Sequence, residues 1–268
     1  MSPRRRSMAL VFVVGLAILA ASYAATSRTA SGSTRIATGT YALDHYECYF
    51  VKPLQIFKPR RVTLLDQFGF RTALVTSPAE LCNPVVKTLP SGVSTPILRK
   101  DAHLLCYNQN PANMAPRQDL VMNQFGEGVV NPVQPSLLCL PSGKSLVLTR
   151  PAKIPVRFDH YALYITKTVA GFTAPPTVTL QDQFWKVTVK GLPKEPVMMG
   201  NPVLKNNPNG QLVNPKDHLV CDAMPTSGLG FKQREVVVTN QFEKAAKYVA
   251  YAPAMLCLPS ALQQDTPG

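Results

Sequence analysis

Apolar and polar residues alternate with a period of two in short segments of this chain. In the segment that follows His45, Tyr46 and Cys48 share one face, whereas Glu47 and Tyr49 share the other. Successive side chains of a β-strand point to opposite faces, so this alternation is typical of strands rather than helices. The pattern recurs throughout the chain and predicts an all-β protein.

A second set of alternating segments ends in Asp-Gln-Phe or Asn-Gln-Phe. Their apolar positions fall on one face and are Val62, Leu64, Val178, Leu180, Val236 and Val238. Asp119 breaks this alternation in one segment, and the pattern does not account for it. The Asp or Asn before Gln-Phe, followed by Gly69 and Gly126 in two cases, predicts a hairpin turn. A third strand is expected after the turn, over 70–75 or 185–190.

These segments belong to a repeat that occurs four times. Each copy begins with a His, and the chain's only histidines are His45, His103, His160 and His218, spaced 58, 57 and 58 residues apart. Each copy then carries a Gln-Phe pair, whose glutamines are Gln67, Gln124, Gln183 and Gln241. Copies one and three share DQF and NPV, whereas copies two and four share NQF and LCLPS. The copies therefore follow an A-B-A-B order.

This order predicts two tandem β domains with approximate twofold symmetry. Each is expected to be a sandwich or barrel of three or four short strands per copy. The expected boundaries are 41–145 and 157–262, with a Pro-containing linker at 146–156 and a tail at 263–268. A continuous array of four equal units is the alternative, but it does not explain why alternate copies match best.

The cysteines indicate how they pair. Copies one, two and four carry two cysteines each, whereas copy three has Leu163 and Gly200 in both positions. Joint absence is expected if the two cysteines of one copy bond to each other, since loss of one alone would leave a free thiol. The predicted disulfides are Cys48–Cys82, Cys106–Cys139 and Cys221–Cys257. A metal site is the weaker alternative, because zinc needs three or four convergent ligands.

The N-terminus has the order of a secretory signal peptide. Arg4, Arg5 and Arg6 precede an uncharged run over 8–21, and small residues follow at Ser22 and Ala24. This pattern predicts a signal peptide at 1–24 that is cleaved after Ala24, with an uncleaved anchor as the alternative. Residues 25–40 are rich in Ser, Thr and Gly and are expected to form a flexible lead-in. The protein is therefore expected to be secreted or periplasmic and to have no membrane span after cleavage.

The formal net charge is +13, and removal of the three signal-peptide arginines leaves +10. Such a balance favours anionic partners, for example an acidic polysaccharide or the envelope surface. Dispersed lysines that only solubilise the surface are the alternative explanation. No motif for specific nucleic-acid binding accompanies the charge.

The recurring residues do not assemble a recognisable catalytic motif. The pairs Asp44-His45, Asp159-His160 and Asp217-His218 invite comparison with a catalytic dyad, but neighbours on a strand face opposite ways. Four equivalent histidines are expected to be structural, each bonding to the Gln of a Gln-Phe pair or to a turn backbone. Trp185 is expected to be buried at a strand start. No catalytic residue, metal ligand or cofactor is predicted.

The strings LDHYECY, VTLLDQFG, LCNPV, HLLCY, NQFG and LCLPS resemble a family of exported bacterial repeat proteins that alternate two half-motifs. The resemblance covers nearly the whole mature chain and implies secretion and a duplicated domain. It carries no established activity or ligand. The chain departs from the pattern at Leu163 and Gly200, and at Trp185 and Glu243 where copies one and two have Gly.

Two classes of function are compatible with this sequence. The favoured one is a secreted, disulfide-stabilised and non-catalytic binding or structural module that contacts anionic polymers. The alternative is an exported hydrolase whose site is not visible as a motif. An enzyme is expected to have one deep pocket with convergent polar groups, whereas a duplicated binding module is expected to have shallow surfaces in both pairs.

Overall fold

The computed structural model of the chain describes residues 42–170, 173, 177–192 and 195–267. The expected signal peptide (1–24) and lead-in (25–40) lie outside these residues. All the regular structure in the described part consists of β-strands, so the all-β prediction is confirmed. Within the same residues, no helix has the length and apolarity needed to cross a membrane.

The strands follow the repeat. Copy one forms β1 (Tyr46–Pro53), β2 (Arg60–Asp66), β3 (Gly69–Pro84), β4 (Val86–Thr88) and β5 (Ser94–Thr95). Copy two forms β6 (His103–Gln109), β7 (Arg117–Asn123) and β8 (Gly126–Ser145). Copy three forms β9 (His160–Ala170), β10 (Thr177–Gln181), β11 (Lys186–Lys190) and β12 (Met198–Lys205). Copy four forms β13 (His218–Ala223), β14 (Arg234–Thr239) and β15 (Ala246–Pro267). The expected tail at 263–268 instead continues β15 as far as Pro267, where it pairs with β7.

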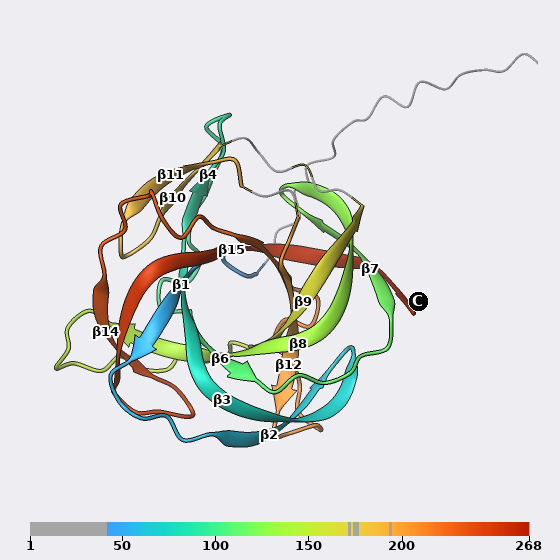
Figure 1. Cartoon of the computed structure of the whole chain (residues 1–268), viewed down its shortest axis with the longest axis horizontal. Coiled ribbons are helices and arrows are strands. Elements are labelled where there is room, and N and C mark those ends of the chain that lie inside the picture. The colour runs from blue at the N-terminus through green and yellow to red at the C-terminus, as the bar shows by residue number, and fades with distance from the viewer. Residues whose placement is uncertain (1–41, 171–172, 174–176, 193–194, 268) are drawn as a thin grey trace, which may run out of the picture. The chain divides into compact units, whose positions relative to one another are not determined.

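Eight of these strands close an antiparallel barrel, two from each copy (Figure 1). Within each copy, the strand that begins near the His pairs with the strand that holds the second Cys position: β1 with β3, β6 with β8, β9 with β12 and β13 with β15. Between copies, β3 pairs with β6, β8 with β9, β12 with β13, and β15 with β1. The last of these pairings joins copy four to copy one and completes the circle.

The remaining strands form hairpins that reach two copies away. The first hairpin strand of copy one, β2, pairs with β12 of copy three, and β10 of copy three pairs with β4 of copy one. In the same way β7 of copy two pairs with β15 of copy four, and β14 of copy four pairs with β8 of copy two. The sequence predicts two separate domains with a linker at 146–156. The strand pairings between the halves show instead that the two halves form one structure. Their strands complete one another's sheets.

Side chains from the two faces of the barrel strands enter two apolar layers. Tyr46 and Cys48 belong to the cluster inside the barrel, with the other cysteines and Leu163. Tyr49 belongs to the cluster between the barrel and the hairpins. The alternation read from the sequence thus separates the correct faces, but both are buried, because the hairpins cover the outer one.

The predicted disulfides all form inside the barrel. Cys48 bonds to Cys82, Cys106 to Cys139 and Cys221 to Cys257, and in each case the two residues are direct cross-strand partners. Neighbouring disulfides are in contact, since the Sγ atoms of Cys82 and Cys106 are 3.9 Å apart and those of Cys48 and Cys257 are 4.0 Å apart. The cysteines thus form a buried band around the interior.

Copy three completes this band without sulfur. Leu163 and Gly200 occupy the same cross-strand positions as the cysteine pairs. A Cβ atom added at Gly200 would lie 3.2 Å from Leu163 Cδ1 and 3.2 Å from Leu219 Cβ. The leucine side chain therefore fills the volume above the glycine, which gives a packing reason for the two replacements to occur together.

The segment expected as a linker packs against the barrel at Gly143. A Cβ atom at this position would lie 2.3 Å from the carbonyl oxygen of Lys153 and 2.6 Å from that of Ala152. Both are backbone atoms, so the segment itself would have to move. We expect Gly143→Ala to lower the free energy of unfolding by about 2–3 kcal/mol, measured by chemical denaturation.

Gly230→Ala provides the control for that substitution. Gly230 has φ +77° and open space around its Cβ position, so alanine there incurs only the left-handed backbone cost of about 1–2 kcal/mol. A loss at Gly143 no larger than the loss at Gly230 would contradict the steric explanation.

Candidate functional site

The four Gln-Phe segments are hairpin turns of one design. The side-chain oxygen of the preceding Asp or Asn accepts a hydrogen bond from the backbone N–H of the Phe two residues later. The donor–acceptor distance is 2.8 Å at Asp66, 2.7 Å at Asn123, 2.7 Å at Asp182 and 2.8 Å at Asn240. Such short side chains fix turns by bonding to their own backbone two residues on. The turns predicted from these residues are confirmed.

Three of the four turns are held by a tyrosine from another copy. Tyr49 of copy one donates to Asp182 Oδ2 of copy three at 2.9 Å, and Tyr164 of copy three donates to Asp66 Oδ2 of copy one at 2.5 Å. Tyr107 of copy two accepts from Asn240 Nδ2 of copy four at 2.8 Å. These exchanges tie opposite hairpins to the barrel, and they join residues that lie more than 90 positions apart.

A cation covers the Phe of each turn. Arg117 Cζ lies 3.8 Å from the centroid of the Phe68 ring. The other three cation–ring pairs and their distances are Lys87–Phe125 at 4.6 Å, Lys144–Phe184 at 4.2 Å and Lys205–Phe242 at 5.1 Å. Burial lowers the pKa of Lys87 and of Lys144 to about 7, with nearby carboxylates acting in the opposite direction. The sequence reasoning missed these cations.

A sequence signal for the lysines was present. In copies one, two and three a Lys follows five residues after the second cysteine position, as Lys87, Lys144 and Lys205. Copy four has Leu262 instead. Leu262 and Phe68 pack against the same buried cluster, and the cation that covers the Phe68 ring is an arginine from another strand. The first turn thus differs from the other three.

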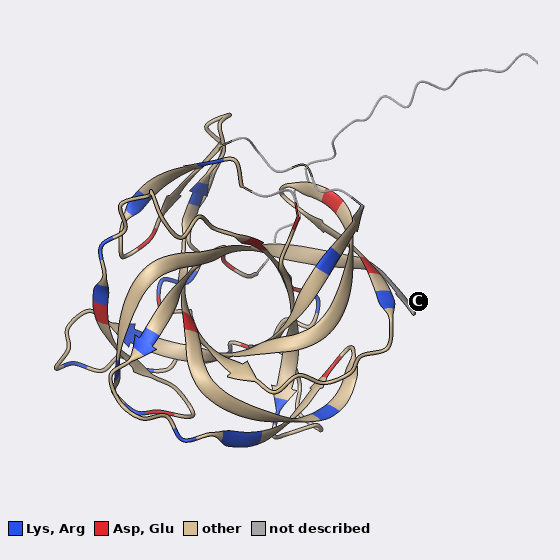
Figure 2. Cartoon of the chain, in the orientation of Figure 1, with Lys and Arg blue, Asp and Glu red and all other residues tan. Residues whose placement is uncertain are grey.

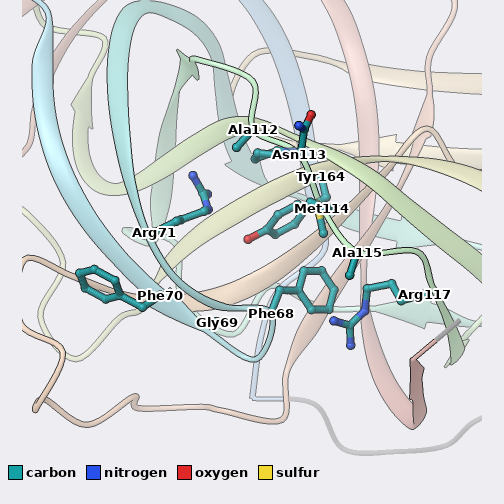
Figure 3. A pocket seen from close by; sticks show the side chains of 11 residues that line it. Phe68, Gly69, Phe70, Arg71, Ala112, Asn113, Met114, Ala115, Arg117 and Tyr164 are labelled. Atoms are coloured by element: carbon teal, nitrogen blue, oxygen red, sulfur yellow. The ribbon is translucent and has the colours of Figure 1, made fainter.

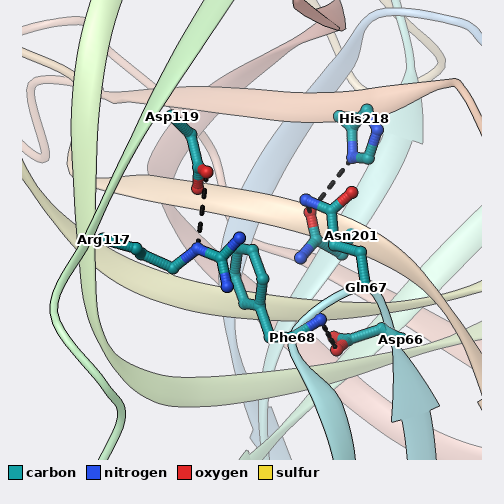
Figure 4. Close-up of polar contacts among 7 residues, drawn as sticks. All are labelled: Asp66, Gln67, Phe68, Arg117, Asp119, Asn201 and His218. Carbon is teal, nitrogen blue, oxygen red and sulfur yellow. Dashed lines mark hydrogen bonds and ion pairs between the residues drawn. The ribbon is translucent and has the colours of Figure 1, made fainter. Parts of the chain in front are cut away.

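The four histidines are largely enclosed around the turns. His160 Nε2 contacts Gln241 Oε1 at 3.3 Å, whereas His45 Nε2 is buried without a hydrogen-bond partner. His218 Nδ1 contacts Asn201 Oδ1 at 3.0 Å, and Gln67 Nε2 donates to the same oxygen at 3.2 Å (Figure 4).

Burial keeps all four imidazoles neutral. It lowers the pKa of His45 to about 3 and the pKa values of His160 and His218 to about 4. Burial, with Lys144 nearby, also lowers the pKa of His103 well below its ordinary value. The remaining glutamine of the four, Gln183, is exposed at its turn.

The aspartates that precede three of the histidines accept hydrogen bonds from backbone groups of other segments and not from the imidazoles. Asp44 accepts the backbone N–H groups of Leu98 and Arg99 at 2.5 and 2.9 Å. Asp159 accepts those of Val213 and Asn214 at 2.9 and 2.7 Å. Among the described residues, the one group of three His, Cys, Asp or Glu close enough to hold a metal is Cys48, Glu80 and Cys82, and its two cysteines already form a disulfide.

A pocket of about 180 Å³ opens beside the first turn (Figure 3). We call it the arginine pocket. Its lining consists of Phe68, Gly69, Phe70, Arg71, Ala112, Asn113, Met114, Ala115, Arg117, Pro135 and Tyr164. Phe70 is 60% exposed at its rim. Aromatic faces and two arginines therefore meet at the one turn whose covering cation is not a lysine.

The two arginines of this pocket are held differently. Arg71 Nη1 donates to Gln109 Oε1 at 2.7 Å, whereas Arg71 Nη2 is buried without a hydrogen-bond partner. Arg117 stacks on Phe68 and forms an ion pair with the buried Asp119 at 3.4 Å (Figure 4). That ion pair accounts for the aspartate that broke the sequence alternation. A buried donor without a partner is costly and suits an incoming acceptor.

Trp185 lies at the start of a strand, before β11, and is partly buried. Its Nε1 donates to Glu47 Oε1 and to the Tyr49 hydroxyl, both at 2.9 Å, and its ring packs edge-on against Phe231. The tryptophan thus ties the third turn to β1.

Comparison of the chain with protein-family models, with curated proteins and with solved structures finds no match.

Proposed function

We propose that this protein is an exported, disulfide-stabilised binding module that holds an acidic group of a polysaccharide in the arginine pocket. The observation that carries the proposal is Arg71, which lines a pocket together with Arg117 and whose buried Nη2 has no hydrogen-bond partner. Guanidinium groups bind carboxylates and sulfates through short, charge-assisted hydrogen bonds. The exposed ring of Phe70 offers an apolar face for a sugar to pack against.

The three disulfides support an oxidising location outside the cytoplasm. Charge alone does not indicate where a partner binds, because Lys and Arg are spread over many separate segments (Figure 2). The arginine pocket is a specific position at which an anionic partner can bind, which the net charge alone does not indicate. Its described lining contains no His, Ser, Cys or carboxylate, which favours binding over hydrolysis as its role.

Arg71→Ala tests the proposal. We expect this substitution to weaken binding of a hexamer of galacturonic acid by tenfold or more, because a hydrogen bond between charged groups contributes about 1.5–3 kcal/mol. Isothermal titration calorimetry at moderate salt measures the effect, and a heparin hexasaccharide replaces the uronate in a second series to separate carboxylate from sulfate.

Arg61→Ala is the matched control. Arg61 is exposed, pairs with Leu74 toward the far end of the same β2–β3 hairpin, and its loss changes the net charge by the same amount. We expect its effect on affinity to stay within twofold. Equal weakening by both substitutions would mean general electrostatic attraction, screened over about 10 Å at 0.1 M salt, and would overturn the pocket assignment.

A further inference from the structure

A second pocket lies on the other side of the same turn. Its volume is about 220 Å³, and Asp66, Gln67, Asn201, Leu212 and His218 contribute to its lining. We call it the amide pocket. Leu65, Asp66 and Gln67 line this pocket, and the next four residues of the chain line the arginine pocket. The two hollows are therefore separated by one tight turn.

The amide pocket offers neutral hydrogen-bonding groups beside the carboxyl of Asp66, whose two oxygens already accept from the Phe68 N–H and the Tyr164 hydroxyl. Asn201 is fully buried, and its Nδ2 has no hydrogen-bond partner. Its Oδ1 is used by His218 and Gln67, as Figure 4 shows for the His218 contact. His218 is neutral because burial lowers its pKa to about 4. Amides and a neutral imidazole beside apolar side chains match the hydroxyl groups and C–H faces of a sugar better than they match an ion.

The sizes of the two pockets point to an extended ligand. Each is smaller than the ~300–1,000 Å³ typical of a pocket that encloses a whole ligand. A chain molecule that crosses the turn fills both, with its acidic group beside Arg71 and a neighbouring unit beside Asn201.

We propose that the arginine pocket and the amide pocket form one continuous site for an acidic oligosaccharide chain. The inference rests on the proposed function and adds the length of the ligand. The ligand is a polymer segment of several sugar units, which binds on both sides of the first turn.

The test is the dependence of affinity on ligand length. Galacturonate oligomers of two, three, four and six units are titrated by calorimetry against the full mature chain. We expect affinity to rise by tenfold or more between the dimer and the longer oligomers. Gln67→Ala is expected to remove most of this rise while leaving dimer affinity within twofold.

Gln183→Ala is the matched control, because Gln183 is exposed at the equivalent position of the third turn. It is expected to leave the length dependence unchanged. Leu212→Trp is a second variant, which narrows the amide pocket from a surface loop without altering the turn. Circular dichroism and thermal unfolding of each variant verify the fold.

The outcomes separate the two proposals. A length-independent affinity that Arg71→Ala still lowers would overturn the continuous site and leave the proposed function standing. A rise with length that Gln67→Ala, Leu212→Trp and Gln183→Ala all leave intact would place the additional contacts elsewhere, and the continuous site would again fail. Absence of binding at every length would overturn both.

Discussion

Replacing Cys106 and Cys139 by alanine is expected to lower the free energy of unfolding by about 2–5 kcal/mol. The bond closes a loop with a sequence separation of 33 residues, and its removal enlarges the freedom of the unfolded chain. Both cysteines are also fully buried, with Cys106 in contact with Cys82 of the neighbouring disulfide, so the alanines leave unfilled volume. Urea denaturation of the oxidised proteins measures the difference.

Cys106→Leu with Cys139→Gly is the control that separates the two effects. It recreates in copy two the pair that copy three carries at Leu163 and Gly200. We expect this variant to recover part of the loss, because leucine fills the space above the glycine while the unfolded chain stays unconstrained. A Leu-Gly variant as unstable as the Ala-Ala variant would contradict the packing explanation for copy three.

Removing the charge of Glu47 is expected to make the protein more stable in alkaline solution. Glu47 is fully buried, one of its oxygens accepts from Trp185, and the other has no partner. Burial raises the pKa of Glu47 to about 8, and Asp182 nearby acts in the same direction. The folded state therefore retains a proton that the unfolded chain loses near pH 4.5. The resulting stability is complete below that pH and is lost as the pH rises through about 8.

Glu47→Gln keeps an acceptor for Trp185 and cannot ionise. Relative to this variant, the wild-type protein is expected to lose stability between pH 5 and pH 8 by up to about 1.4 kcal/mol per pH unit. Trp185 is the chain's only tryptophan, so its fluorescence reports unfolding at the group in question. Lys144 donates a hydrogen bond to Asn83, which in turn donates to Asp182. These groups are common to both proteins, so their contribution to the pH dependence cancels in the comparison.

Glu235→Gln provides the control for pH. Glu235 is exposed on β14, and its neutralisation changes the net charge equally. We expect parallel stability curves for this variant and the wild-type protein. If Glu47→Gln also runs parallel to the wild type, the buried carboxyl is not the source of the pH dependence.

Local features of this fold could be read from the sequence, whereas the partners of its hairpins could not. The alternation around Cys48 and Tyr49 separates the two faces of β1, because that information is contained in neighbouring residues. The missing cysteines of copy three indicate the disulfides, because each bond stays within one copy. The pairing of β2 with β12 could not be predicted in this way, because it joins residues of different copies and no local sequence pattern specifies the partner.

The candidate site shows the same limit. The Asp-Gln-Phe and Asn-Gln-Phe turns were predictable from their own residues, but Arg71 and Arg117 carry no recurring pattern. They come together through Phe68 and Tyr164, which lie 96 positions apart in the chain. The lysines that cover three of the Phe rings do recur, yet their role becomes clear only when each ring has been placed in space.

The hairpin strands of each half of the chain pair with strands of the other half. The half chain 41–145 holds four of the eight barrel strands and leaves β2, β4, β7 and β8 without the partners that copies three and four provide. The second half thus stands where an identical subunit would stand in a twofold dimer. In such a dimer every substitution appears twice. Covalent fusion of the halves removes that restriction, so one turn can carry two arginines and one copy can exchange its disulfide for Leu163 and Gly200 while the opposite copy keeps the original arrangement.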